Sequence, residues 1–287
     1  MKFGVIAPYA VGPVENGGFA VGFARLAEEL GFESIWVVEH VVMKVEYSSV
    51  YPYDPSGRSP FTAQVPQPDP LVWLSYVAAA TERIRLATGV LILPQRNPLV
   101  LAKEVASLDR LSGGRVELGI GVGWVREEAE ALGASFDDRG ARTDEYVAAM
   151  RALWRDPVAS FHGERVRFER VVSEPRPLQP GGVPIVIGGH SPAAARRAGR
   201  YGDGFYPLGV TPEKLAKLRT IVAESAAANG RDPRAIELTL LGTADAASAD
   251  SLAGLGASRM VIAAREGDLR ALRATLERFR RDVIERF

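Results

Sequence analysis

Three short stretches of the sequence hold residue types that could do chemistry. Glu39 and His40 form an acid–imidazole pair directly after a run of branched residues, "SIWVV". A histidine in such a place can donate to a ligand, transfer a proton or bind a metal ion. Further along the chain, "GIGVGW" ends in Trp124, and "GGHSP" leads into an alanine-rich segment. Each stretch follows a predicted strand, so its position depends on the fold that these strands make.

The stretch "GGHSP", residues 188–192, could hold an anion. Its two glycines can adopt conformations closed to other residues, Ser191 can cap a helix, and Pro192 suits the first helical turn. The free N–H groups at such a helix start carry partial positive charge and suit a phosphate. The same residues would also make an ordinary capped corner, and both interpretations stay open. Arg196 and Arg197 lie too far into the helix to serve the turn, so we expect them to be solvated or packed on a neighbour.

The glycines of residues 119–124, "GIGVGW", only superficially resemble a dinucleotide fingerprint. Their spacing is G-x-G-x-G, and no second mononucleotide-binding half follows. We interpret the stretch as a strand that packs closely at its exit. We expect no metal site, because His40, His162 and His190 show no paired spacing and the chain has no cysteine.

Composition excludes several classes of partner. Of 287 residues, 47% are hydrophobic and 24% charged, which is typical of a globular protein. Basic and acidic residues number 35 each, so no basic field favours nucleic acid or a membrane surface. No apolar run approaches the length needed to span a bilayer, and we expect a cytoplasmic protein.

Short branched runs alternate with amphipathic segments along the whole chain. The pattern begins with "KFGVIAP" before "GFAVGFARLAEELG" and ends with "SRMVIAA" before a helix over residues 268–284. We count eight strands, each followed by a helix. Eight units in this length predict an α/β fold, a single (β/α)8 TIM-barrel domain over residues 1–287. Residues 157–182 fall outside the repeat and are expected to form an inserted hairpin between units four and five.

A barrel places its active end at the C-terminal ends of the strands. That geometry brings Glu39, His40 and the two glycine-rich turns to one mouth. A long irregular segment, residues 41–68, follows the second strand and carries Tyr47, Tyr51 and Tyr53. Loops of this length in a compact domain are usually functional or disordered.

As a set, four stretches resemble the luciferase-like monooxygenase superfamily: "KFGVIAP", "ESIWVVEH", "RIRLATGVLILPQRNPLVLAKEVASLDRLSGGRVELGIGVGW" and "VPIVIGGHSPAAARRAGRYGDGF". The resemblance covers nearly the whole chain and is weakest in residues 41–68 and from Leu240 onward. Within the superfamily, the sequence is most similar to short oxidoreductases that use the deazaflavin coenzyme F420. The resemblance therefore implies hydride transfer between F420 and a small-molecule substrate, and a homodimer packed through the early helices.

The resemblance also implies roles for individual residues. His40 would lie beside the reactive ring and exchange a proton, with Glu39 as the other member of the catalytic pair. A non-proline cis peptide would fall at Gly89–Val90, against the ring, and residues 188–191 would hold the phosphate tail. The implied cofactor-binding set is His40, Thr88, Gly89, Val90, Asn97 (a ring-side amide), Gly121, Gly123, Gly188, Gly189, His190 and Ser191.

One departure from the family pattern concerns the substrate. Trp124 stands where sugar-phosphate-oxidising relatives carry an acid, so a sugar phosphate is not expected. Together with Tyr47 and Tyr51, Trp124 predicts a pocket for a less polar, planar substrate. Two alternatives remain open. One is a monooxygenase that uses reduced FMN and O2, since the same turn and peptide would serve it; the other is a flavin-binding barrel without catalytic activity.

Overall fold

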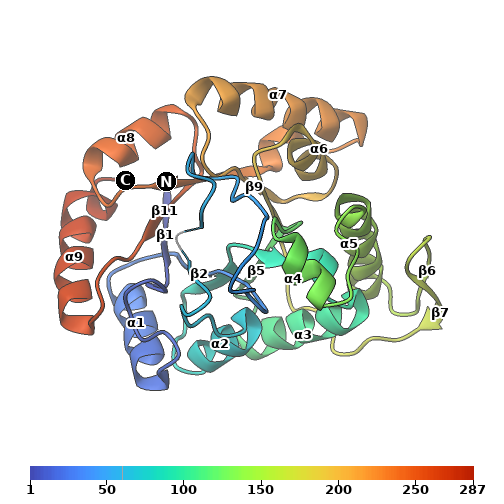
Figure 1. Ribbon diagram of the computed structural model, residues 1–287, viewed down its shortest axis with the longest axis horizontal. Helices are drawn as coiled ribbons and strands as arrows, with labels where there is room; N and C mark the ends of the chain where they lie inside the picture. Colours follow the sequence, from blue (N-terminus) through green and yellow to red (C-terminus); the bar gives the residue numbers. More distant parts are fainter. Residues whose placement is uncertain (60) are drawn as a thin grey trace.

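Eight parallel strands close into a barrel, as the sequence predicts (Figure 1). The computed structural model describes residues 1–59 and 61–287. The barrel strands are β1 (Lys2–Ile6), β2 (Ser34–Val37), β3 (Arg85–Thr88), β5 (Val116–Gly121), β8 (Ile185–Gly188), β9 (Gly204–Tyr206), β10 (Glu237–Gly242) and β11 (Arg259–Ala263). The ring closes because β1 pairs with both β2 and β11, while β3 pairs with β5. A two-residue strand, β4 (Leu91–Ile92), continues the third unit and also pairs with β5.

Helices surround the barrel. They are α1 (Gly17–Glu29), α2 (Pro70–Ala78), α3 (Pro98–Leu111), α4 (Arg126–Ala131), α5 (Arg139–Arg155), α6 (Pro192–Tyr201), α7 (Pro212–Ala228), α8 (Ala246–Gly254) and α9 (Leu269–Asp282), with 3-10 turns η1 (Leu93–Gln95), η2 (Pro233–Ala235) and η3 (Ile284–Arg286). Many begin with the signals the sequence carries: a capping side chain such as Asp69 or Thr211, followed directly by proline. In α9, Leu272, Leu276 and Phe279 share one buried face, which packs the last helix on the barrel.

The predicted insertion is present as a hairpin. Strands β6 (Ala159–His162) and β7 (Arg167–Val171) pair antiparallel between α5 and β8. Figure 1 shows them at the edge of the molecule, away from the barrel strands. The hairpin therefore adds to the outside of the barrel and leaves its mouth unchanged.

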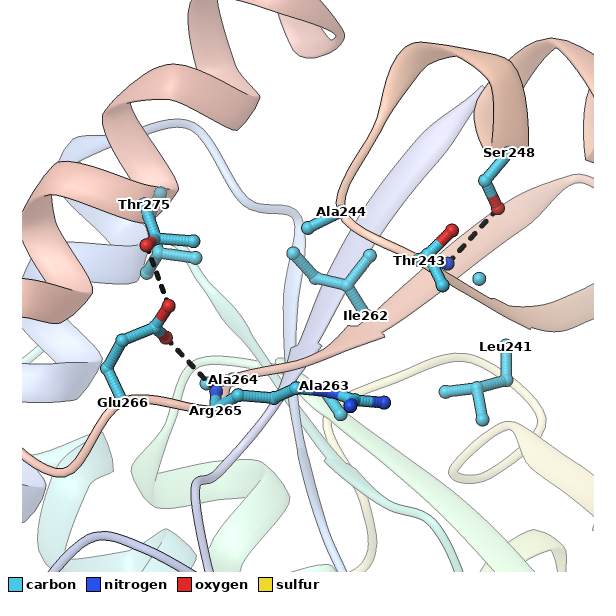
Figure 2. Close-up of a pocket in the computed structure, with 12 residues that line it drawn as sticks. Leu241, Thr243, Ala244, Ser248, Ile262, Ala263, Ala264, Arg265, Glu266 and Thr275 are labelled. Atoms are coloured by element: carbon cyan, nitrogen blue, oxygen red, sulfur yellow. Dashed lines mark hydrogen bonds between the residues drawn. The ribbon is translucent and has the colours of Figure 1, made fainter.

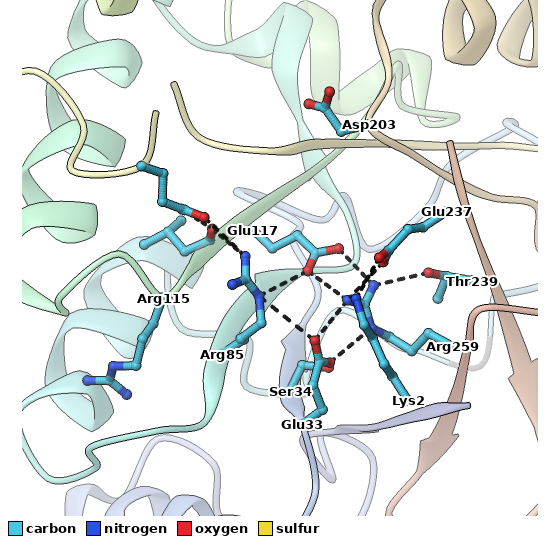
Figure 3. Close-up of polar contacts among 12 residues, drawn as sticks. Lys2, Glu33, Ser34, Arg85, Arg115, Glu117, Asp203, Glu237, Thr239 and Arg259 are labelled. Carbon is cyan, nitrogen blue, oxygen red and sulfur yellow. Dashed lines mark hydrogen bonds and ion pairs between the residues drawn. The ribbon is translucent and has the colours of Figure 1, made fainter. Parts of the chain in front are cut away.

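The two ends of the barrel differ in chemistry. At the C-terminal end, a cavity of about 520 Å³ opens where β10 and β11 finish (Figure 2). At the N-terminal end, a cluster of charged side chains fills the barrel (Figure 3). This cavity thus opens at the mouth, whereas ion pairs fill the opposite end of the barrel.

Arg259 of β11 is the centre of that charged cluster. Its guanidinium is 1% exposed and bonds both oxygens of Glu117 on β5, with N–O distances of 2.8 and 2.9 Å, and both oxygens of Glu33 before β2, each at 3.0 Å. Burial alone would lower the pKa of Arg259, but the facing carboxylates raise it above its ordinary value. The same guanidinium lies 5.4 Å from the ring centre of Trp36. One cation therefore ties strands from opposite sides of the ring.

We expect Glu117→Gln to lower the free energy of unfolding by about 3 kcal/mol, because it breaks a buried ion pair and leaves part of the Arg259 charge uncompensated. Urea denaturation followed by circular dichroism measures the change. The matched control is Arg273→Gln, which breaks an exposed pair with Glu29 and is expected to cost much less, because solvent screens surface ion pairs. Equal losses in the two variants would contradict this role for the cluster.

Candidate active site

His40 is oriented by a carboxylate that the sequence analysis did not single out. Strand β2 ends at Val37, so Glu39 and His40 lie just beyond its C-terminal end, at the mouth. The Nδ1 atom of His40 lies 2.8 Å from Oε2 of Glu128, whose side chain is fully buried. A carboxylate only accepts, so Nδ1 carries the hydrogen and Nε2 is left to exchange a proton with a ligand.

Glu128 also fixes the backbone that follows His40. Its second oxygen accepts the N–H of Val41 at 2.7 Å. The residue lies in the first turns of α4, four positions after Trp124. The signal available in the sequence was the acidic pair in "WVREE", directly after a strand-end glycine turn.

Glu39 holds the third unit of the barrel in place. Its carboxylate accepts the N–H of Ile92 at 2.5 Å and the Nε–H of Arg96 at 2.9 Å. Burial raises the pKa of Glu39 above its usual range, although Arg96 acts in the opposite direction. Arg96 also pairs with Asp69, the cap of α2. Glu39 therefore fixes the chain just after the Gly89–Val90 peptide, a task that its position in the sequence did not reveal.

The peptide bond between Gly89 and Val90 is cis, as the resemblance implied. The glycines of "GIGVG" make room for this segment, because a Cβ there would collide with it. One at Gly119 would meet the carbonyl oxygen of Thr88, one at Gly121 would lie 2.7 Å from Cγ2 of Val90, and one at Gly123 would lie 2.8 Å from Cγ2 of Ile92. The close strand packing that we inferred from this motif is confirmed. Gly121 and Gly123 have a structural reason to be glycine, and their contact with a cofactor stays a prediction.

The turn after β8 is a capped corner that keeps unused donors. Gly189 has a φ of 116°, and Ser191 caps α6 by accepting the N–H of Ala194 at 3.1 Å. The N–H of Gly189 is taken by the carbonyl of Tyr206. Within residues 1–59 and 61–287, the N–H groups of His190, Ser191 and Ala193 donate to no protein atom. These donors at the positive end of α6 fit an anion such as a phosphate.

Arg196 and Arg197 of α6 do not serve the turn, as expected. Arg197 is buried, and its Nε lies 2.5 Å from Oδ1 of Asp144 on α5, while Arg196 is exposed. Gly188 is also occupied structurally, since a Cβ there would lie 2.7 Å from Cγ1 of Val90. In the turn after β8, the backbone N–H groups are therefore the donors that a ligand can use.

A chain of aromatic rings crosses the mouth. Most of these rings belong to residues 41–59, called the strap below. The strap follows β2 and precedes α2 in the chain, and it is drawn in blue in Figure 1. Trp124 lies at the centre of the chain of rings, with ring centres 5.8 Å from His40, 5.6 Å from Tyr47 and 5.1 Å from Tyr51. Tyr53 continues the chain to His190, 4.9 Å away. The structure thus places Trp124 against His40 and the two predicted tyrosines against Trp124, and Tyr53 links this group to the turn after β8.

The neighbouring acid on α4 anchors the strap. Glu127 accepts the N–H of Ser48 at 2.6 Å and the Oγ–H of Ser49 at 2.6 Å. The hydrogen bond from Ser49 is the main cause that lowers the pKa of Glu127 to about 2. A depressed carboxylate pKa means that this anchor is fully present above about pH 4.5 and weakens as the pH falls towards 2.

Asn97, a predicted cofactor-binding residue, has a structural task in the described chain. The side-chain oxygen of Asn97 caps α3, accepting the N–H groups of Leu99 and Val100 at 3.0 and 3.2 Å. Its place beside a ring stays a prediction. His162 lies on the hairpin and pairs with the exposed Glu169. Across residues 1–59 and 61–287, no three acidic, histidine or cysteine side chains gather as metal ligands, and no helix is long and apolar enough to cross a membrane.

Comparisons with known proteins place this geometry in a family. The sequence model of the luciferase-like monooxygenases matches residues 1–281. The chain belongs to that family. It is therefore an enzyme of the oxidoreductase class, and its barrel is the family's fold.

Individual relatives add detail. The chain is 34% identical over 242 residues to the F420-dependent glucose-6-phosphate dehydrogenase of Kineococcus radiotolerans, a match that spans 81% of this chain and 66% of that protein, slightly under two thirds of its length. The crystal structure of the monooxygenase RslO1 from Streptomyces bottropensis superposes with a TM-score of 0.81 at 25% identity, over 100% of this chain and 99% of that one. An F420-dependent secondary alcohol dehydrogenase holding an F420–acetone adduct shares the fold, with a TM-score of 0.77 at 21% identity over 99% and 98% of the two chains.

We expect Glu128→Gln to release His40 from a single tautomer, because an amide can both donate and accept where the carboxylate only accepts. Long-range ¹⁵N NMR of the three histidines reports the change. His40 in the native protein should show a protonated Nδ1, and the variant should show a mixture. His162, which pairs with Glu169 on the hairpin, is the internal control. An unchanged His40 pattern would contradict the role assigned to Glu128.

Proposed function

We propose that this enzyme transfers a hydride between the deazaflavin F420 and a small, largely apolar, planar organic substrate. The observation that carries the proposal is the His40–Glu128 pair beside the ring of Trp124. Within residues 1–59 and 61–287, Nε2 of His40 has no hydrogen-bond partner, so it is open to a ligand. The relative from Kineococcus radiotolerans, whose name gives F420 as its cofactor, supports this choice. Trp124 and the tyrosines of the strap favour a substrate other than a sugar phosphate.

The residues present fit such a cofactor. The unused N–H groups of His190, Ser191 and Ala193 would hold its phosphate, and the Gly89–Val90 segment would face its ring. When bound, F420 supplies a carbon that gives or takes a hydride. His40 delivers or removes the accompanying proton through Nε2, while Glu128 keeps the imidazole in position. Trp124, Tyr51 and Tyr53 cover the site and exclude water from it.

A second function has support of its own. RslO1, with 25% identity over the whole chain, is a monooxygenase, and the same turn and cis peptide would serve reduced FMN and O2. The alternative of a non-catalytic barrel gives no reason for a buried carboxylate that orients a histidine at the mouth. The FMN monooxygenase is therefore the rival that an experiment has to separate.

Cofactor titration of the native enzyme and of His40→Ala makes that separation. We expect both proteins to bind F420 with similar Kd and to bind FMN far more weakly. With reduced F420 and cyclohex-2-en-1-one as the probe, His40→Ala should lose at least about 100-fold in turnover, the usual size of a lost general acid. His162→Ala on the hairpin should match the native enzyme. Tight FMN binding without F420 binding would refute the cofactor, and full turnover by His40→Ala would remove His40 from the mechanism.

We also propose that two copies associate through α2 and α3, which pack side by side (Figure 1). Val72 and Tyr76 of α2 and Val100 of α3 are apolar and 69%, 55% and 55% exposed. Neighbouring exposed apolar side chains of this kind are typical of an interface.

Light scattering coupled to size-exclusion chromatography tests the association. The native chain should elute with twice the mass of one copy, and Tyr76→Glu should shift it towards a single copy, since it would bury a charge at the interface. Val172→Glu, at a 63% exposed position beyond β7, is the control. A monomeric native chain, or a dimer that Tyr76→Glu leaves intact, would contradict this interface.

A further inference from the structure

The cavity at the ends of β10 and β11 is a second part of the mouth that the proposed mechanism does not use. Building on the proposed function, we propose that this cavity binds the carboxylate end of the substrate, and that Arg265 holds the carboxylate. The substrate class would then be an organic carboxylate with an apolar body. The argument rests on the place of the cavity, its walls and its charges.

The place of the cavity suits a substrate. In the ring of strands, β10 and β11 stand opposite β3 and β5, which carry the cis peptide and the glycine turn. A cofactor ring lying against Gly89–Val90 would therefore turn its other face towards β10 and β11. A substrate on that face would reach the cavity without crossing the turn at residues 188–191, where the phosphate is proposed to bind.

The walls of the cavity are mostly apolar. They are formed by Leu241, Ala244, Ile262, Ala263, Ala264 and Leu276. A volume of about 520 Å³ is within the range of small-molecule sites. The cavity can therefore take the hydrocarbon part of a ligand as well as a polar end.

Most of its polar side chains are already engaged with one another. Ser248 accepts the N–H of Thr243, whose hydroxyl donates to Asp245. Glu266 accepts the hydroxyl of Thr275 with one oxygen and the backbone N–H of Arg265 with the other. These groups cap the start of α8 and join β11 to α9, and they offer little to a ligand.

The guanidinium of Arg265 is the exception. Among residues 1–59 and 61–287, no hydrogen bond or ion pair engages it, and only the backbone N–H of this residue is bonded. Figure 2 shows its side chain extending away from Glu266 and Thr275, beneath Ile262 and towards Leu241. A planar guanidinium matches a carboxylate with two parallel hydrogen bonds.

The charges favour a monoanion over a phosphate dianion. Arg265 is the only basic residue among those that line the cavity in the described chain, and Glu266 lines it too. A carboxylate is neutralised by one guanidinium, whereas a phosphate monoester would keep a negative charge beside Glu266. A carboxylate is therefore the class that the cavity fits.

Calorimetric titration of the cofactor-free enzyme with matched probes tests the proposal. We expect 3-phenylpropanoate to bind at least about tenfold more tightly than 3-phenylpropanamide, which has the same shape without the charge, and more tightly than 3-phenylpropyl phosphate. Arg265→Gln should remove the preference for the acid over the amide, and Arg265→Lys should keep part of it. Ala244→Trp, which fills the cavity, should weaken both probes.

Two controls tie the result to this cavity. Arg196→Gln, on the exposed side of α6, should bind the acid as the native enzyme does. F420 should bind Arg265→Gln with its native Kd. Equal affinity for acid and amide, an undiminished preference in Arg265→Gln, or tighter binding of the phosphate would overturn the proposal. So would a parallel loss of F420 affinity in Arg265→Gln, because the cavity would then belong to the cofactor. Preference for the acid in a protein that binds no F420 would uphold this site while refuting the proposed function.

Discussion

The ion pairs of Arg259 with Glu117 and Glu33 are the constraint on which the barrel depends. A closed ring of strands can be sealed at its centre by apolar side chains or by charges, and here one buried cation is held by carboxylates from two other places in the ring. Such a cluster is stable only when every member is paired. Removing one partner leaves an uncompensated charge inside the barrel, so the cluster selects the arrangement in which β2, β5 and β11 meet. The relative positions of the strands at this end also fix where their C-terminal ends lie, at the opposite, functional end of the barrel.

At the functional end, the main constraint is packing among the third, fourth and fifth units of the barrel. The side chain of Val90 lies between Gly121 and Gly188, so three neighbouring strands meet at the Gly89–Val90 segment. Glu39 fixes the chain just after it through Ile92 and Arg96. The space beside the glycines at these strand ends is thus filled by side chains of the protein, and this packing positions the cis peptide.

The short helix α4 connects the barrel end at His40 to the strap that lies over it. Two adjacent acids divide the work: Glu128 orients His40 and fixes Val41, while Glu127 anchors the strap at Ser48 and Ser49. His40 and the aromatic rings near it are therefore held by the same turn of helix. A ligand that displaces the strap would act directly on the support of His40.

The sequence by itself determined the eight strand–helix units, the inserted hairpin, the cap of α6 at Ser191 and the place of His40 at the mouth. These features depend on local periodicity, on caps and on the order of elements, which neighbouring residues encode. The cis peptide followed from likeness to known sequences. Only the tertiary structure decided that Glu128 orients His40, that Glu39 supports the third unit of the barrel, that Arg259 seals the far end and that Arg265 faces a cavity. Each of these contacts joins residues that are far apart in the chain or that point in directions no periodicity specifies. Closure of the ring, rather than any short motif, brings them together.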